Sequence, residues 1–246
     1  MRLLPLIALI SISQAHAEIG VSAGTITDTR TDGKFFASLE VKLILSGPEL
    51  ANAKGMRVRL ATATDNTGKN LIDKEKLGFF GDSFRPLEEP FGPEPAKKGD
   101  FETEVKLANP PRAATSISLT GSIELLSPDA DPSSVISLDV AEIAGKVIDT
   151  PALKAAGAEI TVNKPKGDEF SYKIKDTGNK VAVVEFCSAE GKPLKTNGTS
   201  SMGFGSTKSC SVSIPNAPDK VTVKIHLLTE KSLVKVPLKL TGLKLP

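Results

Sequence analysis

The chain has 246 residues, of which 31 are Lys or Arg and 29 are Asp or Glu, so its formal net charge is +2. Charges of both signs are interspersed and aromatic residues make up only 4% of the chain. Neither a basic field nor a set of stacking rings is therefore present to bind nucleic acid. The length suits one large domain or two of medium size, and we predict two.

The N-terminus has the pattern of a signal peptide. Arg2 is followed by an apolar run, residues 3–12, that is too short to span a bilayer, and Ala15-His16-Ala17 is an A-x-A cleavage site. We predict that residues 1–17 are removed and that the mature protein is periplasmic or secreted. No later stretch is long enough for a transmembrane helix, and no cysteine near Glu18 is placed to receive a lipid, so neither kind of anchor is expected.

Alternation of apolar and polar residues dominates the rest of the chain, as in strands that bury one face of an antiparallel sheet. Every second residue from Phe35 to Leu45 is apolar and falls on one face, while Ser38, Glu40 and Lys42 lie on the other. We therefore predict an all-β fold of two antiparallel β-sandwich domains of immunoglobulin-like character, the first over residues 18–150. Similar stretches cover residues 56–60, 101–107, 117–125, 136–140, 170–174, 181–186, 210–214, 221–227 and 234–240.

One short helix interrupts this alternation. Thr150 is a suitable N-cap, Pro151 suits the first helical position, and Gly157 suits the C-terminal end. We predict that residues 151–157 are a helical linker between the first domain and a second β-sandwich over residues 158–246.

The segment 73–100 is a long loop rich in proline and phenylalanine, through which no helix or central strand can run. Its rings, at Phe79, Phe80, Phe84 and Phe91, have two interpretations. They plug the open end or edge of the first sandwich, which is the usual role of a loop folded on its own domain. Alternatively, some of them face outward as anchors for another envelope or extracellular protein.

Cys187 and Cys210 are the only cysteines, and export would place them in an oxidising compartment. We predict a structural disulfide between them, which would contribute roughly 3 kcal/mol in the chain-entropy model. Cys210 shares its face with Val212 and Ile214, so its side chain is expected to point into a core.

The sequence contains no recognisable catalytic or metal-binding constellation, and we expect neither enzyme activity nor a cofactor. His226, the only histidine of the mature chain, alternates in phase with Thr222 and Lys224 and is expected to face water. The glycine-rich segment 198–205 lacks the Lys and Ser/Thr of a phosphate-binding loop and is expected to form a flexible hairpin connection.

Two acidic segments and one repeat have local interpretations. Asp129 and Asp131 would support weak surface binding of calcium at most, because the other EF-hand ligands are missing. The stretch Asp65-Asn66-Thr67 is expected to form a turn whose side chains bond the local backbone. Gly68-Lys69-Asn70-Leu71 and Gly191-Lys192-Pro193-Leu194 form a short repeat, which fits either a duplicated sandwich unit or two unrelated turns.

Three stretches, residues 55–71, 109–126 and 234–246, resemble a group of exported bacterial proteins with paired immunoglobulin-like β-sandwich domains and no assigned activity. The resemblance implies architecture and export. Together these features predict a non-enzymatic protein-interaction or structural module of the bacterial envelope. The alternative is an envelope hydrolase or glycan-binding protein that uses carboxylates.

Overall fold

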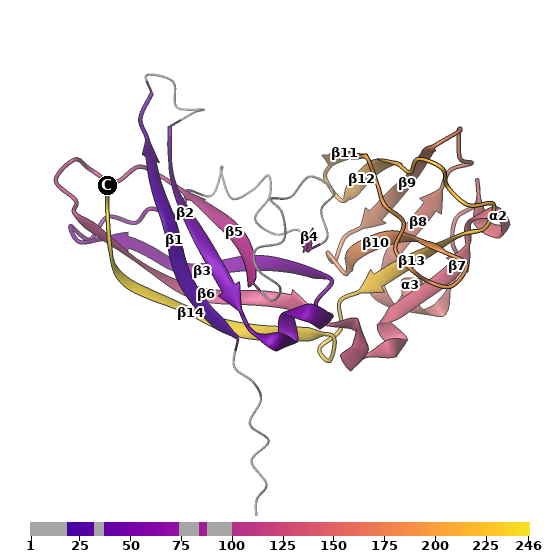
Figure 1. Cartoon of the computed structure of the whole chain (residues 1–246), viewed down its shortest axis with the longest axis horizontal. Helices are drawn as coiled ribbons and strands as arrows, with labels where there is room; N and C mark the ends of the chain where they lie inside the picture. Colours follow the sequence, from indigo (N-terminus) through magenta and orange to yellow (C-terminus); the bar gives the residue numbers. More distant parts are fainter. Residues whose placement is uncertain (1–18, 32–36, 74–83, 88–99) are drawn as a thin grey trace, which may run out of the picture.

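The computed structural model describes residues 19–31, 37–73, 84–87 and 100–246. The predicted signal peptide and three of the loop phenylalanines, Phe79, Phe80 and Phe91, lie outside these ranges. The described chain forms antiparallel sheets arranged in two lobes (Figure 1). The prediction of an all-β fold is confirmed.

The first lobe consists of two sheets, with strand orders β1-β2-β5 and β14-β6-β3-β4. The 3-10 helix η1 (Pro48–Asn52) lies between β2 and β3. The strands are β1 (Gly20–Thr29), β2 (Ser38–Ser46), β3 (Gly55–Asp65), β4 (Arg85–Pro86), β5 (Asp100–Leu107), β6 (Ser116–Leu126) and β14 (Leu233–Lys244).

The second lobe also consists of two sheets, with strand orders β10-β13-β7 and β11-β12-β9-β8. Two 3-10 helices, η2 (Pro128–Ala130) and η3 (Pro132–Ser134), lead into it from β6. Its strands are β7 (Val135–Asp139), β8 (Ala158–Val162), β9 (Glu169–Asp176), β10 (Val181–Ser188), β11 (Gly198–Phe204), β12 (Thr207–Ser213) and β13 (Val221–Leu227).

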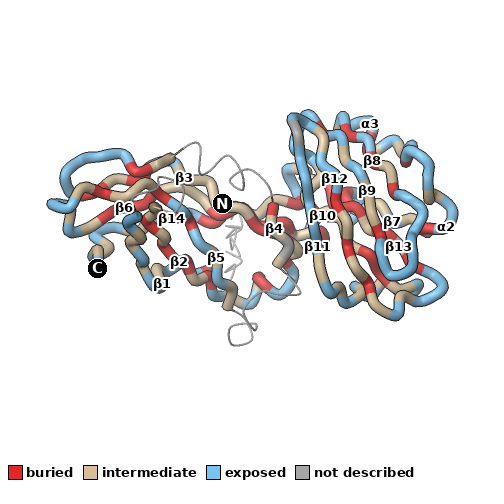
Figure 2. The backbone as a smooth tube through the Cα atoms, turned by 90° about the horizontal axis from the view of Figure 1, so that it is seen from above, coloured by how far each residue is buried: buried red, intermediate tan, exposed pale blue. Residues whose placement is uncertain are grey.

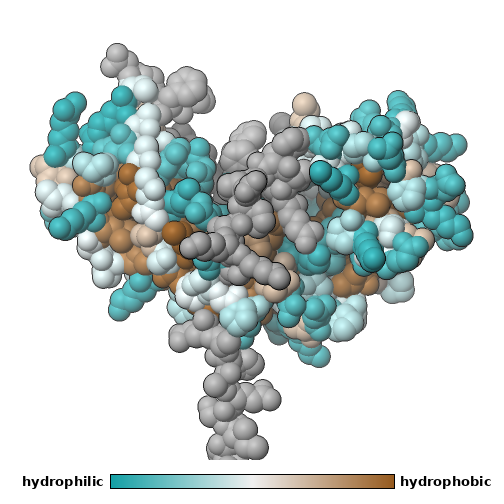
Figure 3. All heavy atoms as spheres, viewed as in Figure 1, coloured by the Kyte–Doolittle hydropathy of each residue, from teal (hydrophilic) through white to brown (hydrophobic). Residues whose placement is uncertain are grey.

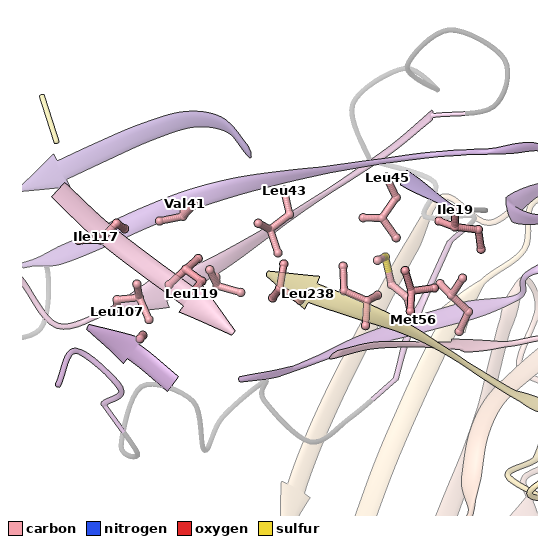
Figure 4. Close-up of a cluster of buried hydrophobic side chains, with 14 of the residues drawn as sticks. Ile19, Val41, Leu43, Leu45, Met56, Leu107, Ile117, Leu119 and Leu238 are labelled. Carbon is pink, nitrogen blue, oxygen red and sulfur yellow. The ribbon is translucent and has the colours of Figure 1, made fainter. Parts of the chain in front are cut away.

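Each lobe has its own hydrophobic core between its two sheets (Figure 2). In the first lobe, alternate residues of β2 face those of β6 and β14 across the core, as the side chains labelled in Figure 4 show. Leu39, Val41, Leu43 and Leu45 are all fully buried, as their alternation predicts. Each such side chain contributes roughly 1.5–3 kcal/mol on burial. Figure 3 shows hydrophilic residues over much of the second lobe.

The chain passes between the lobes twice, and this corrects the predicted domain boundaries. β7 follows β6 in the sequence but pairs with β13 of the second lobe, whereas β14 follows β13 but pairs with β6 of the first. The second lobe is thus inserted between β6 and β14, and the C-terminus lies on the first lobe (Figure 1). Alternation reveals a strand and its apolar face, but it does not specify which strand pairs with it.

The predicted helix is present as α3 (Pro151–Ala156). The Thr150 hydroxyl accepts a hydrogen bond from the Leu153 N–H at 3.3 Å, and Gly157 ends the helix with φ 67°. However, α3 packs into the core of the second lobe through Leu153 and does not link the lobes. A shorter helix, α2 (Val140–Ile143), follows β7. Neither helix is long enough to cross a membrane, nor does any other described segment form one that is.

The short repeat found in the sequence forms the same local structure in both lobes. In each copy the glycine N–H donates to the carbonyl three residues earlier, and the leucine N–H donates to the carbonyl eight residues earlier. Both turns therefore fold back along the strand that precedes them, β3 or β10. The four bonds are Gly68 to Asp65, Gly191 to Ser188, Leu71 to Ala63 and Leu194 to Phe186.

Candidate functional site

His226 is buried at the junction between the lobes, and the expectation that it faces water is wrong. As predicted, its side chain lies on the face of β13 opposite to Ile225 and Leu227, which belong to the core of the second lobe. Yet only 3% of His226 is exposed. The first lobe packs against this end of the sheet, as the contact of Val183 on β10 with Phe84 and Leu126 shows.

His226 is the innermost member of a chain of charged and polar groups that crosses the junction. Its Nε2 lies 3.1 Å from Oε2 of Glu185 on β10, and the other Glu185 oxygen lies 3.6 Å from Nζ of Lys54 in the first lobe. Burial alone would raise the pKa of Glu185. The hydrogen bond with His226 and the charges of Lys54, His226 and Lys224 outweigh burial and hold the pKa below its ordinary value.

The second ring nitrogen of His226, Nδ1, is buried and has no hydrogen-bond partner in the described part of the chain. Because the ionised Glu185 carboxylate only accepts hydrogen bonds, Nε2 of His226 is the donor in this contact. The contacts of His226 with Glu185, and of Glu185 with Lys54, join the second lobe to the first.

A second ion pair lies beside the first, on the sheet of the first lobe that faces the junction. Arg57 Nε on β3 lies 2.5 Å from Glu124 Oε2 on β6, and both side chains are about nine-tenths buried. The Arg57 guanidinium also lies over the ring of Phe84, 4.6 Å from its centroid. Phe84 is 8% exposed and packs against Val183 of the second lobe, so in this structure it is a packing residue and not an exposed anchor for a partner.

The two segments that connect the lobes are hydrogen-bonded to each other. The Ser127 N–H donates to the Ser232 carbonyl at 2.8 Å, and the Thr229 hydroxyl donates to Asp131 Oδ2 at 2.6 Å. Hydrogen bonds from Ser133 and Thr229 lower the pKa of Asp131. Asp131 is thus engaged in joining the two segments.

No disulfide joins Cys187 and Cys210, and that prediction is wrong. Both thiols are buried, but they lie on different sheets of the second lobe. Cys187 follows the core residue Phe186 and so faces away from the core, and its backbone forms an isolated bridge with Pro193. Cys210 points inward as expected. Burial raises the pKa of Tyr172, and Cys210, to which its hydroxyl is hydrogen-bonded, raises that pKa further.

The glycine-rich segment also differs from its prediction, because residues 198–204 form the strand β11. Its serines and glycines have weak strand propensity, but pairing with β12 over its whole length fixes it as an edge strand. Only Gly205, with φ 61°, lies in the turn that follows.

The turn predicted at Asp65 is confirmed. Asp65 Oδ1 accepts hydrogen bonds from the N–H groups of Thr67 and Lys69 and from the Thr67 hydroxyl, at 2.7–3.0 Å. Asn66 accepts from the N–H of Thr115. Elsewhere in the described ranges, no three His, Cys, Asp or Glu side chains are grouped so that they could hold a metal ion.

Sequence reasoning missed most of the junction, namely Lys54, Arg57, Glu124 and Glu185. One signal could have revealed it. The run Val181-Ala182-Val183-Val184 is apolar on both faces, which is typical of a strand covered on both sides.

Comparisons of the chain with protein-family models, with curated proteins and with solved structures gave no significant match.

Proposed function

We propose that this protein is an exported, non-enzymatic structural or interaction module of the bacterial envelope. In this proposal its two lobes are immunoglobulin-like β-sandwich domains that act as one rigid body. Export is supported by the charged, apolar and A-x-A pattern of residues 1–17. The immunoglobulin-like assignment is supported by antiparallel sheets packed in pairs around separate cores.

The observation that carries this proposal is the construction of the junction. Domains joined by one flexible linker usually move relative to each other. Here the chain crosses twice, the two crossing segments are hydrogen-bonded, and an apolar contact at Phe84 lies beside the Lys54–Glu185–His226 group. Such a junction holds the far ends of the two lobes at a fixed separation, as a spacer or adaptor requires.

The close approach of the two lobes supports the same conclusion. A Cβ atom added at Gly55 on β3 would lie 3.0 Å from Val183 Cγ2 of the second lobe and 3.1 Å from the Arg85 carbonyl oxygen. The absence of a side chain at Gly55 therefore permits this packing. A rigid module would lose its geometry if a larger residue were placed there.

The test is site-specific photo-crosslinking in cells, with the crosslinking residue placed in turn at exposed positions of each lobe. We expect covalent products with a defined envelope protein and an N-terminus at Glu18 in the purified product. The variant Gly55→Val should reduce crosslinking without loss of the protein, whereas its matched control Ala61→Val, at an exposed position of the same strand, should not. Turnover of peptidoglycan, glycans or esters by the purified protein, or a product that remains cytoplasmic, would refute the proposal.

A further inference from the structure

Basic residues gather on the outer face of one sheet of the first lobe. On β14, Lys235 and Lys239 alternate with core residues such as Leu238, so both lysines lie on the outer face of the sheet. Lys244 lies on the same face beyond a register shift, because its neighbour Leu243 packs against the core. All three lysines are exposed, and none forms an ion pair with another residue in the described part of the chain.

Two arginines extend this charge across the sheet to β3. Arg57 and Arg59 alternate with Val58, which packs against the core, so both lie on the outer face. Glu124 on β6 is the one acidic residue that β14, β6 and β3 carry on this face, and it forms ion pairs with both arginines. We call this surface the basic face; its charged residues are Arg57, Arg59, Glu124, Lys235, Lys239 and Lys244. Charges that are interspersed along the sequence are thus separated in space by the alternation of the strands.

The other outer face of the first lobe, on β2 and β5, pairs its lysines with glutamates. Lys42 Nζ lies 2.8 Å from Glu102, and Lys106 Nζ lies 3.1 Å from Glu40 and 3.6 Å from Glu104. A second copy of the protein would have to break these pairs to present the same carboxylates to the basic face. The chain also carries a net positive charge, so the basic face favours a different, negatively charged occupant.

A row of hydroxyl groups lies between the lysines and the arginines. Alternate residues of β6 carry a hydroxyl on the outer face, and all four are half-buried: Ser116, Ser118, Thr120 and Ser122. The Thr120 hydroxyl is hydrogen-bonded to that of Thr62 on β3 at 2.6 Å. Each hydroxyl can donate one hydrogen bond and accept two. The three strands contain no aromatic residue, so they offer no ring on which a nucleobase could stack.

The spacing of the lysines indicates a ligand whose charges are far apart. Lys235 and Lys239 are four residues apart on an extended strand, or about 13 Å, and Lys244 is five residues further, or about 16 Å. In DNA each strand carries a phosphate about every 3.4 Å along the axis, so most phosphates would meet no cation here. Between the lysines β14 directs Pro237 and Thr241 outward, and neither gives a bilayer a large apolar side chain to bury.

We propose that the basic face binds an acidic polysaccharide, an extended glycan whose carboxylates are separated by sugars that carry only hydroxyl and other uncharged groups. The lysines of β14 would pair with the carboxylates, and the hydroxyl row of β6 would bond to the groups between them. This proposal rests on the envelope interaction role proposed above and names one class of ligand for it.

The test is titration of the purified mature protein with a hyaluronan octasaccharide, which carries a carboxylate on every second sugar. We expect saturable binding, with changes in amide chemical shift confined to β3, β6 and β14. The affinity should fall about tenfold when the ionic strength rises from about 0.05 M to about 0.5 M, because the Debye length shortens. The same octasaccharide with its carboxylates methyl-esterified should bind about tenfold more weakly or not at all.

The double variant Lys239→Gln/Lys244→Gln removes two exposed charges from the basic face and should weaken binding about tenfold. Its matched control, Lys166→Gln/Lys208→Gln, removes two exposed charges from the second lobe and should bind as the wild type does. Lys239→Arg/Lys244→Arg keeps the charges and should also retain binding.

Four results would overturn the proposal. They are equal binding by Lys239→Gln/Lys244→Gln, equal binding of the methyl-esterified octasaccharide, tighter binding to single-stranded DNA or to vesicles of anionic lipid, and self-association that the same double variant abolishes. Failure to bind the octasaccharide, together with crosslinks to an envelope protein, would leave the module role intact and reject this ligand alone.

Discussion

Replacing Glu185 with glutamine tests the junction directly, because the amide keeps the shape of the side chain and removes its charge. His226 would lose a charged acceptor at 3.1 Å, and Lys54 would lose a counter-charge at 3.6 Å. A hydrogen bond to a charged group contributes about 1.5–3 kcal/mol and a neutral one about 1 kcal/mol. The Lys54 contact is partly exposed and adds less than about 1 kcal/mol. We therefore expect the free energy of unfolding to fall by about 2 kcal/mol at neutral pH.

The pH dependence of this difference has a defined sign. The pKa of Glu185 is lower in the folded protein than its ordinary value of 4.5. Its contribution to stability is therefore fully present above the ordinary value and is lost as the pH falls through the lower folded value. The wild type and Glu185→Gln should differ at neutral pH and become equally stable once Glu185 is protonated.

Urea denaturation followed by far-UV circular dichroism would measure this difference. Fluorescence of Tyr172, the single tyrosine, would report the second lobe separately, because its ring packs against Phe186. The control is Glu102→Gln, which removes an exposed pair with Lys42 and should cost less than about 1 kcal/mol. A loss below about 0.5 kcal/mol for Glu185→Gln, or a loss that persists in full when the carboxyl is protonated, would refute this account of the junction.

Three other predictions concern the fold. A Cβ at Gly121 would lie 2.0 Å from the Arg59 carbonyl oxygen, so Gly121→Ala should destabilise the protein by more than about 2 kcal/mol in thermal denaturation, whereas Gly198→Ala in open space should be nearly neutral. Both cysteines should react with a thiol reagent only after unfolding, and a reducing agent should leave the melting temperature unchanged; a drop in that temperature would reveal a disulfide. Because Leu126 and Leu233 are paired neighbours on β6 and β14, replacing the second lobe with an Asn-Gly turn between them should yield a first lobe that folds cooperatively, and a disordered product by circular dichroism would contradict the inserted arrangement.

Features that depend on residues close together in the chain could be predicted from the sequence. The inward face of β2, the helix capped by Thr150 and the turn bonded by Asp65 all follow from a period of two or from contacts within four residues. Cys210 was placed correctly for the same reason, because its face is shared with Val212.

The tertiary structure alone decided what pairs with each strand and what covers each outer face. β14 returns to the first lobe, Cys187 turns away from the core that Cys210 enters, and the outward face of β13 at His226 is covered by another lobe. Alternation distinguishes the two faces of a strand but carries no information about which distant segment lies against them. That choice depends on long-range packing, and here it turned an apparently solvent-facing histidine into the centre of the junction.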